Sequence, residues 1–218
     1  DGLAPVQVEL DGLFGCIDPT GAFVIQPQFR DMAFFSEGLA PMPVQQPGER
    51  PNWGYIDTAG AFVIEPQFYD AARFSEGLAG VTLGGRDGDE YGFIDRTGEF
   101  VFQVYLPAVE PVSGSDYSFR EGLAAWVGDD GRWGFMDRTG TFVIAPEFDE
   151  VTPFSEGLAA VCVRINTSTW GYIDKTGAWV IEPRFRHAEP FSHGLARVLL
   201  GTRQAYVDPV GKVMWQAP

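Results

Sequence analysis

The stretch Phe154-Ser155-Glu156-Gly157-Leu158-Ala159, followed by Trp170-Gly171-Tyr172-Ile173-Asp174, is written repeatedly along this chain. Its first phrase recurs, intact or with one residue changed, at 35–40, 74–79, 119–124 and 191–196. Its glycines, counted from the opening Asp1-Gly2-Leu3-Ala4, lie at 2, 38, 77, 122, 157 and 194, so the steps are 36, 39, 45, 35 and 37 residues. A period of this size indicates one supersecondary unit copied about six times.

Each copy reads as short β-strands joined by turns. In the fifth copy, 158–163 is an apolar run with β-branched residues, long enough for one strand and too short for a stable helix. Residues 170–174 and 179–181 give two further strands, the last ended by Pro183, which has no N–H for a strand ladder. The segment 185–191 crosses to the next copy and is a candidate fourth strand. The sequence therefore predicts an all-β fold with three or four short antiparallel strands per copy.

Two acidic residues recur from copy to copy, and both are interpreted as structural. The Asp of an Asp-x-x-Gly turn accepts hydrogen bonds from backbone N–H groups, and the Gly supplies the positive φ of a type I turn with a bulge. This turn is written at 18–21, 57–60, 95–98, 137–140, 174–177 and 208–211. The Glu of Ser-Glu-Gly-Leu is placed in a turn before a strand. Neither residue is therefore predicted to be a repeated catalytic or metal-binding acid.

The Trp-Gly pair is interpreted as part of the core. The glycine after each Trp is expected to leave room for an aromatic ring of a neighbouring strand or copy. The aromatic residues at this place are then expected to stack copy upon copy: Trp53, Tyr91, Trp133 and Trp170. Because one copy cannot bury its apolar face alone, its stability is expected to come from its neighbours.

Two architectures fit units of this size. A four-stranded unit of about 40 residues has the size of a propeller blade, so the preferred prediction is a β-propeller-like single domain over 1–218. The alternative is an open array or solenoid capped by its terminal copies, which divergent ends at 14–16 and 205–207 favour. The copies are divided at about 1–35, 36–74, 75–119, 120–154, 155–191 and 192–218.

The composition is acidic and globular. Against 15 Lys and Arg stand 30 Asp and Glu, and the net charge of −15 argues against a nucleic-acid partner or an anionic membrane surface. The chain contains no run of 18 apolar residues, so no membrane span is predicted. Cys16 and Cys162 are expected to be small buried apolar residues. No cofactor motif is present, and the start at Asp1 without Met fits an exported protein that has lost a signal peptide.

Function is expected where a copy departs from the pattern. The third copy departs most, because 103–118 replaces the usual Pro-x-Phe, and the loops 45–52, 84–90, 128–132 and 164–169 are expected to line one rim. The interaction residues predicted from this insertion and these loops are Tyr105, Leu106, Ser113, Asp116, Tyr117, Arg86 and Arg50.

Metal binding has little support in the sequence. Asp87, Asp89 and Glu90 are candidate ligands, but their spacing matches only the beginning of a calcium loop. His187 and His193 lack the further ligands of a zinc site. We therefore predict no metal, and we interpret 84–90 as an exposed acidic hairpin.

The consensus Phe-Ser-Glu-Gly-Leu-Ala-x-Val … Trp-Gly-Tyr-Ile-Asp-x-Thr-Gly-x-Phe-Val-Ile-x-Pro-x-Phe resembles the bacterial WG-repeat family, named for its Trp-Gly pair. The match covers essentially the whole chain, and its best copies carry Trp53-Gly54, Trp133-Gly134 and Trp170-Gly171. The resemblance implies a β-rich repeat protein, often exported or envelope-associated, without an established common enzymatic activity. It provides no catalytic residues.

Three functions remain open. The prediction is a non-catalytic binding or structural module of an exported or cell-envelope assembly, extracellular or periplasmic, that contacts a protein partner through its inter-strand loops and 103–118. The second is a carbohydrate-binding protein that exposes Tyr105, Tyr117 and Trp126. The third is a hydrolase that uses a pair of carboxylates.

Overall fold

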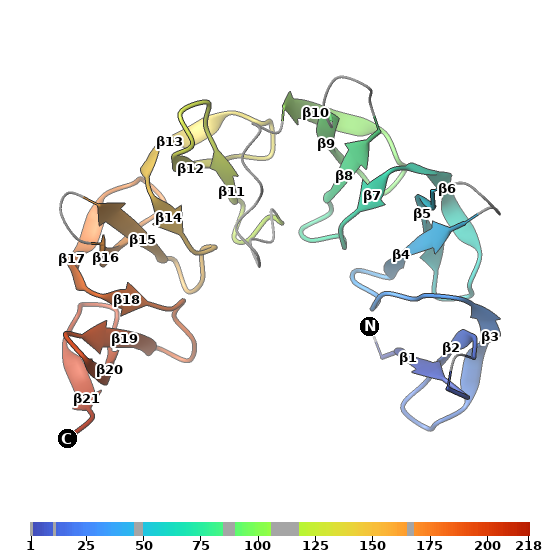
Figure 1. The fold of residues 1–218 in the computed structure, drawn as a ribbon, viewed down its shortest axis with the longest axis horizontal. Helices are drawn as coiled ribbons and strands as arrows, with labels where there is room; N and C mark the ends of the chain where they lie inside the picture. Colours follow the sequence, from blue (N-terminus) through green and yellow to red (C-terminus); the bar gives the residue numbers. More distant parts are fainter. Residues whose placement is uncertain (1, 11, 46–49, 85–89, 106–117, 165–167) are drawn as a thin grey trace. The chain divides into compact units, whose positions relative to one another are not determined.

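The computed structural model describes residues 2–10, 12–45, 50–84, 90–105, 118–164 and 168–218. These residues form strands β1 to β21 and no helix, as the sequence predicts. The chain is divided into two compact units, Asp1–Leu106 and Pro107–Pro218. Each unit consists of small antiparallel sheets that follow one another along the chain (Figure 1).

The first unit holds three sheets, β1-β2-β3, β4-β5-β6 and β10-β9-β8-β7. Its strands are β1 (Ala4–Gln7), β2 (Phe14–Ile17), β3 (Phe23–Phe29), β4 (Leu39–Val44), β5 (Asn52–Asp57), β6 (Phe62–Phe68), β7 (Asp70–Ala71), β8 (Ala79–Leu83), β9 (Glu90–Ile94) and β10 (Phe100–Tyr105).

The second unit holds the sheets β11-β12-β13, β14-β15-β16-β17 and β18-β19-β20-β21. Its strands are β11 (Ala124–Val127), β12 (Trp133–Met136), β13 (Phe142–Phe148), β14 (Glu150–Val151), β15 (Ala159–Arg164), β16 (Ser168–Ile173), β17 (Trp179–Phe185), β18 (His187–Ala188), β19 (Ala196–Leu200), β20 (Arg203–Val207) and β21 (Val213–Gln216). Three or four strands per sheet confirm the predicted fold class.

The fourth strand of a sheet comes from the segment that crosses between copies. β18 follows β17 after one residue, yet it pairs with β19, with His187 opposite Leu199 and Ala188 opposite Val198 (Figure 1). β7 and β14 are related to their sheets in the same way. The prediction that the crossing segment adds a strand is therefore confirmed in three sheets.

The Asp-x-x-Gly turns join the second and third long strands. At 174–177, the Asp174 N–H donates to the Ala178 carbonyl at 2.9 Å and the Gly177 N–H donates to the Asp174 carbonyl at 3.0 Å. The Asp174 carboxylate accepts from the Thr176 N–H at 2.8 Å and from its hydroxyl at 2.6 Å. With φ of 85° at Gly177, this is the predicted type I turn with a bulge. The interpretation of the repeated Asp as structural is confirmed.

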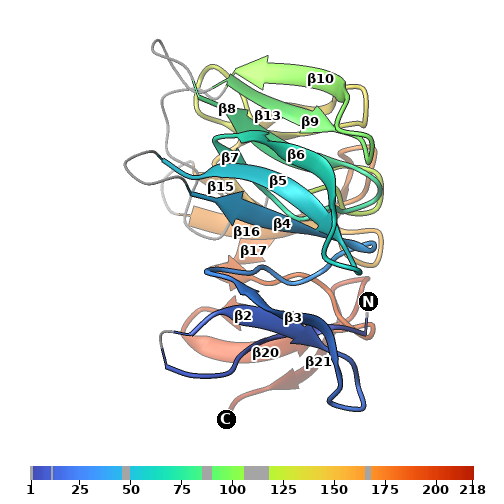
Figure 2. The same ribbon diagram turned by 90° about the vertical axis from the view of Figure 1, so that its right-hand side faces the viewer.

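The glycine after Trp has a different purpose from the one predicted. A Cβ on Gly54 would lie 2.4 Å from the Ile64 carbonyl oxygen and 2.7 Å from the Pro66 nitrogen, so backbone rather than a ring fills this space. β6 bulges there, because Trp53 pairs with Phe68 while Tyr55 pairs with Ile64 (Figure 2 shows β4, β5 and β6 side by side). The same contact occurs at Gly15, Gly134 and Gly171. Among the five glycines at this place in the repeat, Gly92 differs, because a Cβ there would mainly meet the Phe100 ring.

Proline explains the bulge. Pro66 has no N–H to give to the ladder, so the strand departs from regular pairing and presses its backbone against the glycine. In the third copy Val104 stands in the place of proline and pairs regularly with Tyr91. In the sixth copy Ala205 replaces the glycine, and it pairs regularly with Gln216. The bulge therefore occurs in the copies that have both residues, the proline in the third strand and the glycine that makes room for its backbone.

The apolar cores lie between successive sheets rather than within one. One cluster joins Tyr172 and Ile181 of the β14–β17 sheet with Ala196 and Val207 of the β18–β21 sheet. Two more clusters join the first sheet to the second and the second to the third. The expectation that each copy depends on its neighbours is confirmed within each unit.

Three ring pairs join a sheet to the segment that leads to the next sheet, and each involves the aromatic residue two positions after Trp or its counterpart. The Tyr55 ring lies 4.9 Å from that of Phe74, and its hydroxyl donates to the Ala72 carbonyl at 2.7 Å. Tyr172–Phe191 and Phe135–Phe154 repeat the ring contact at 4.8 and 4.7 Å. Tyr91, Trp133 and Trp170 are buried as predicted, and Trp53 is half-buried.

Both cysteines are free and fully buried. The Cys16 thiol donates to the Met32 sulfur at 3.4 Å. Burial raises the pKa of each thiol. The expectation that they behave as small apolar core residues is confirmed.

Candidate functional site

Each sheet has two chemically different ends. Leu39, at the start of β4, pairs with Asp57, at the end of β5, so the Ser-Glu-Gly-Leu and Asp-x-x-Gly turns lie together at what we name the repeat-turn end. At the opposite end, Val44 pairs with Asn52, and the hairpin between them belongs to what we name the loop end. Of the candidate site predicted from the sequence, the described parts that lie at the loop end are Arg50 and the backbone of Tyr105.

The Ser-Glu-Gly-Leu turn is a two-residue hairpin. Ser36 and Leu39 exchange both backbone hydrogen bonds, at 2.9 and 3.1 Å. Glu37 and Gly38 have φ of 54° and 80°, the left-handed pair of a type I′ turn. A non-glycine residue in this conformation costs about 1–3 kcal/mol. Residues with the same positive φ occupy this place elsewhere: Glu76, Glu121, Glu156 and His193.

The glutamate is kept in this strained place by a bond to the next copy. The Glu37 carboxylate accepts from the Gly77 N–H at 2.9 Å. The same bond links Glu121 to Gly157 at 3.0 Å and Glu156 to Gly194 at 2.9 Å. This role was missed by sequence reasoning, which placed the Glu in a local turn. The available signal was that Glu and Gly recur together at the same spacing.

Serine and a cation add to this junction. The Ser36 hydroxyl donates to the Phe74 carbonyl at 2.7 Å, in the segment between β7 and β8 of the next sheet. Lys175 lies 3.0 Å from Glu121, also one copy away. Burial raises the pKa of Glu121, but hydrogen bonds from Lys175 and Gly157 outweigh it, so the net pKa is lowered. The repeated polar groups are thus engaged in joining the copies.

The turn aspartates are engaged as well. The hydrogen bond from the Thr176 hydroxyl is the main cause that lowers the pKa of Asp174. Threonine two residues on lowers the pKa in the same way at Asp18, Asp95 and Asp137. These carboxylates are therefore stabilised as anions that hold their own turns, which is not the raised pKa of a general acid.

Most of the predicted interaction residues lie outside the described residues. They are Arg86, Leu106, Ser113, Asp116 and Tyr117, and the metal candidates Asp87 and Asp89 lie outside the described residues as well. Of Tyr105 the structure describes the backbone, which pairs with exposed Glu90 at the end of β10. Arg50 is exposed, and its guanidinium lies 5.4 Å from the Tyr69 ring centre and donates to the Tyr69 hydroxyl. Arg50 and Glu90 therefore mark the loop end on the described part of the chain.

The hairpin 128–132 is described in full. The Gly128 N–H donates to the Arg132 carbonyl at 2.7 Å, and the Asp130 carboxylate accepts from the Arg132 N–H at 3.0 Å. It is a tight turn, as its sequence predicts. In contrast, Trp126 is 3% exposed, so its expected place on the surface is wrong. All four residues of β11 are buried, and alternation therefore does not bring Trp126 to the surface.

Among the described residues, no group of three or more His, Cys, Asp or Glu side chains is placed to hold a metal ion. The His187 ring contacts that of Trp170, with centres 5.5 Å apart, and His193 Nδ1 lies 3.0 Å from the Ser192 hydroxyl. The described residues also include no helix long and apolar enough to cross a membrane.

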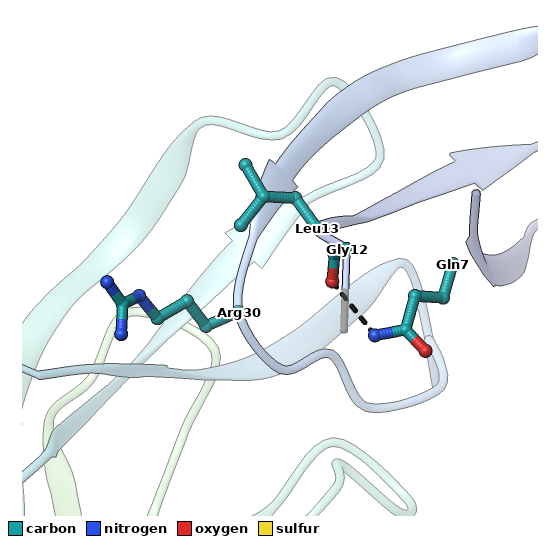
Figure 3. Close-up of a pocket in the computed structure, with 4 residues that line it drawn as sticks. All are labelled: Gln7, Gly12, Leu13 and Arg30. Carbon is teal, nitrogen blue, oxygen red and sulfur yellow. Dashed lines mark hydrogen bonds between the residues drawn. The ribbon is translucent and has the colours of Figure 1, made fainter. Parts of the chain in front are cut away.

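One pocket was not anticipated by sequence reasoning. It has a volume of about 500 Å³ and lies in the first sheet, lined by Gln7, Gly12, Leu13 and Arg30 (Figure 3). The Gln7 side-chain amide donates to the Gly12 carbonyl at 2.8 Å, which closes the turn between β1 and β2. Of these four described lining residues only Arg30 is charged, so they include no acid–base pair.

Comparison with known families agrees with the repeat pattern. The family described as WG containing repeat matches residues 14–42, 53–86, 133–164 and 170–201, more than half of the chain. The chain belongs to the WG-repeat family. The four matched segments include the Trp-Gly pairs of the second, fourth and fifth copies and the Phe-Gly variant of the first.

Comparisons with individual proteins give distant likenesses. No curated protein matches this WG-repeat chain. Among solved structures, it is similar to a puromycin hydrolase S511A mutant complexed with PGG, with 13% identity, a TM-score of 0.46, and coverage of 100% of this chain and 46% of the other. It is also similar to a quinonprotein alcohol dehydrogenase-like protein from Bacteroides thetaiotaomicron, with 11% identity, a TM-score of 0.39, and coverage of 100% and 53%. The chain thus spans about half the length of these structures.

Proposed function

We propose that this WG-repeat chain is a non-catalytic interaction module that binds a protein partner through its loop end and the 103–118 insertion. The observation that carries the proposal is the contrast between the two ends of the sheets. At the repeat-turn end, Glu37, Ser36 and their counterparts are bound to the next copy. Groups used in this way hold the scaffold together and are not available to recognise a ligand.

The loop end differs from copy to copy. β4 and β5 are separated by 45–51, β8 and β9 by 84–89, β11 and β12 by 128–132, and β19 and β20 by 201–202. Variable connections on a regular scaffold are the usual place for binding residues. This variation supports recognition of one specific partner rather than a repeated ligand.

The absence of catalysis is part of the same proposal. The turn aspartates have lowered pKa values with structural causes, which supports a scaffold role. Trp126 is buried and cannot contact a carbohydrate, so of the three aromatic residues named for the carbohydrate-binding alternative, Tyr105 and Tyr117 remain. The exported or cell-envelope setting is proposed from the resemblance to WG-repeat proteins, and fractionation of the native cells tests it.

A site-specific cross-linking experiment tests the binding surface. A photoreactive phenylalanine replaces either Arg50 at the loop end or Thr58 at the repeat-turn end of the same sheet; both positions are exposed. The proposal expects a partner protein from the native source to be captured at position 50 and not at position 58. Capture at position 58 alone, or equally at both, contradicts the proposal. Deleting 106–117, which leaves β10 (Phe100–Tyr105) whole, should remove capture while the thermal midpoint stays nearly unchanged.

A further inference from the structure

Two arginines lie in one row across the loop end of the β18–β21 sheet, where β18, β19 and β20 lie side by side (Figure 1). Leu200 pairs with Arg203, and His187 pairs with Leu199. The Arg186 N–H donates to the Leu199 carbonyl at 2.8 Å, so Arg186 continues this ladder opposite Leu200. Residues directly opposite one another on neighbouring strands have their side chains on the same face. Arg186, Leu200 and Arg203 therefore form one row, which we name the arginine row.

The arginine row faces the preceding sheet and is accessible there. Leu200 is half-buried and packs against the apolar cluster that joins the β14–β17 sheet to the β18–β21 sheet. Arg186 and Arg203 are nevertheless exposed. The β4–β6 sheet packs against another sheet on either side within its unit, yet Val44 and Asn52, at the same place as Leu200 and Arg203, are exposed. Exposure of this row therefore does not depend on whether a further sheet follows.

In other sheets, polar groups at these places are bound within the scaffold. Asp149, the crossing residue of the β14–β17 sheet, accepts from the Arg164 N–H at 2.7 Å. Arg132, just before β12, donates to the Glu147 carbonyl at 3.2 Å. The two guanidinium groups of the arginine row differ, because neither has a hydrogen bond or an ion pair among the residues that the structure describes.

Nearby carboxylates already have cations of their own. Glu150 is ion-paired with Arg164, and Glu189 is ion-paired with Arg197. Two cross-strand steps place the Cβ atoms of the two arginines in the row roughly 10 Å apart. At that distance, about one Debye length in physiological salt, their charges still repel each other weakly. An anionic group lying over the row would be attracted by both, in a chain whose net charge of −15 makes such an unpaired pair unusual.

We propose that the arginine row binds an acidic segment of the protein partner. Arg186 and Arg203 receive its Asp or Glu carboxylates, and an apolar side chain between them lies against Leu200. A planar guanidinium group takes a carboxylate through two parallel hydrogen bonds, which gives direction as well as attraction. In an extended segment each residue adds about 3.3 Å, so two acidic residues about three positions apart match the row. This proposal rests on the proposed function, which it deepens by naming the chemistry of the partner.

Peptide binding tests the row without the native partner. The probe is a fluorescent peptide, Gly-Ser-Glu-Leu-Gly-Glu-Ser-Gly, and its control has Gln in place of both Glu residues. Fluorescence anisotropy is measured at about 0.05 M salt, where surface charges are weakly screened. We expect the Glu peptide to bind more tightly than the Gln peptide, by about fivefold for each arginine engaged. Equal affinity for the two peptides overturns the proposal.

Charge reversal separates the row from the net charge of the chain. Arg186→Glu and Arg203→Glu should each weaken binding of the Glu peptide by about fivefold or more. Lys212→Glu is the matched control, because Lys212 is exposed at the repeat-turn end of the same sheet and the net charge changes equally. All three positions are exposed, so each variant should keep the wild-type thermal midpoint. Equal weakening by Lys212→Glu, or no weakening by either arginine variant, overturns the proposal.

Capture of the native partner separates this proposal from the proposed function. With a photoreactive phenylalanine at position 50, Arg186→Glu combined with Arg203→Glu should reduce capture, and Lys212→Glu should not. Undiminished capture in the double variant overturns the role of the row and leaves the proposed function standing. No capture in any background, with peptide binding that depends on the row, contradicts the proposed function and leaves the acidic ligand of the row.

A phosphate-bearing ligand is a separate outcome. The same peptide is prepared with phosphoserine in place of both Glu residues, and inorganic phosphate is added as a competitor of the Glu peptide. We expect the two peptides to bind within about tenfold of each other, since both present anionic oxygens to guanidinium groups. A larger preference for phosphoserine, or displacement of the Glu peptide by inorganic phosphate, overturns the assignment to carboxylates.

Discussion

Replacement of Gly54 by alanine is the most direct test of how a WG repeat is built. The new Cβ would lie 2.4 Å from the Ile64 oxygen, 2.7 Å from the Pro66 nitrogen and 2.9 Å from the Glu65 carbonyl carbon. All three atoms are backbone, so no side chain can turn away. The strand must shift as a whole, and Pro66 prevents a return to regular pairing because it lacks an N–H.

The magnitude follows from two opposing effects. Overpacking of this kind costs about 1–3 kcal/mol, and the rigid contact favours the upper end. Alanine recovers about 0.5–1 kcal/mol because it restricts the unfolded chain more than glycine does. We expect a net loss of about 2 kcal/mol, which lowers the thermal midpoint by roughly 5–10 °C for a unit of this size.

This loss in the free energy of unfolding is measured by urea unfolding of the wild type, Gly54→Ala and two further variants. Ala205→Gly is the matched control, because no bulge faces Ala205, and it should cost only about 0.5–1 kcal/mol. Gly54→Ala combined with Pro66→Ala recreates the alanines that the sixth copy has at 205 and 217, and should recover most of the loss. A neutral or stabilising Gly54→Ala, or a double variant no better than the single, would refute the reasoning.

Four further predictions concern other parts of the repeat. Glu156→Ala should lower the free energy of unfolding by about 2 kcal/mol, because it removes a charge-assisted hydrogen bond to the Gly194 N–H. Glu156→Gly should cost about 1 kcal/mol less, because glycine adopts the left-handed φ without strain. The denaturation midpoints of the two variants test this difference. In the folded protein the turn aspartates have pKa values below 3.8, so their contribution to the free energy of unfolding is complete above that pH and is lost as pH falls through the folded values: Asp18, Asp95, Asp137 and Asp174. Replacing the threonine two residues after each aspartate by alanine should make stability depend less on pH in the acid range, as measured by thermal melts at a series of pH values. Tyr172→Phe should cost about 1 kcal/mol through the lost bond to the Glu189 carbonyl, in thermal melts. Cys16 and Cys162 should react with a thiol reagent only after unfolding, and rapid labelling of the native protein would contradict their burial.

The fold class and the turns could be predicted because they depend on neighbours in the sequence. Asp174 bonds to residues two and four positions ahead, within its own turn. Pro183 lacks an N–H wherever it stands, so a disturbance of the third strand could also be predicted. The predicted end of that strand at Pro183 is wrong, because β17 continues past the proline to Phe185 with a shift in register. Hydrogen bonds within a turn recur wherever the turn sequence recurs, and the same backbone bonds are present in the Asp-x-x-Gly turn of each copy.

The candidate site could be predicted only in part. The loop connections were placed at one end of the sheets, and Arg50 and Glu90 lie there. The prediction that Trp126 is exposed was wrong because β11 is covered on both faces, which the sequence of a four-residue strand does not reveal. The contacts of the predicted residues in 106–117 stay predictions.

By itself, the sequence determined the repeat, its strands and its Asp-x-x-Gly turns, since each rests on residues a few positions apart. Only the tertiary structure decided why Gly54 must be glycine and why Glu37 tolerates a left-handed backbone. The first depends on the bulged backbone of the next strand, and the second on an N–H one copy away. Contacts between segments that are distant in sequence leave no local pattern, so packing alone could show that the repeated phrase is mainly a joint between copies.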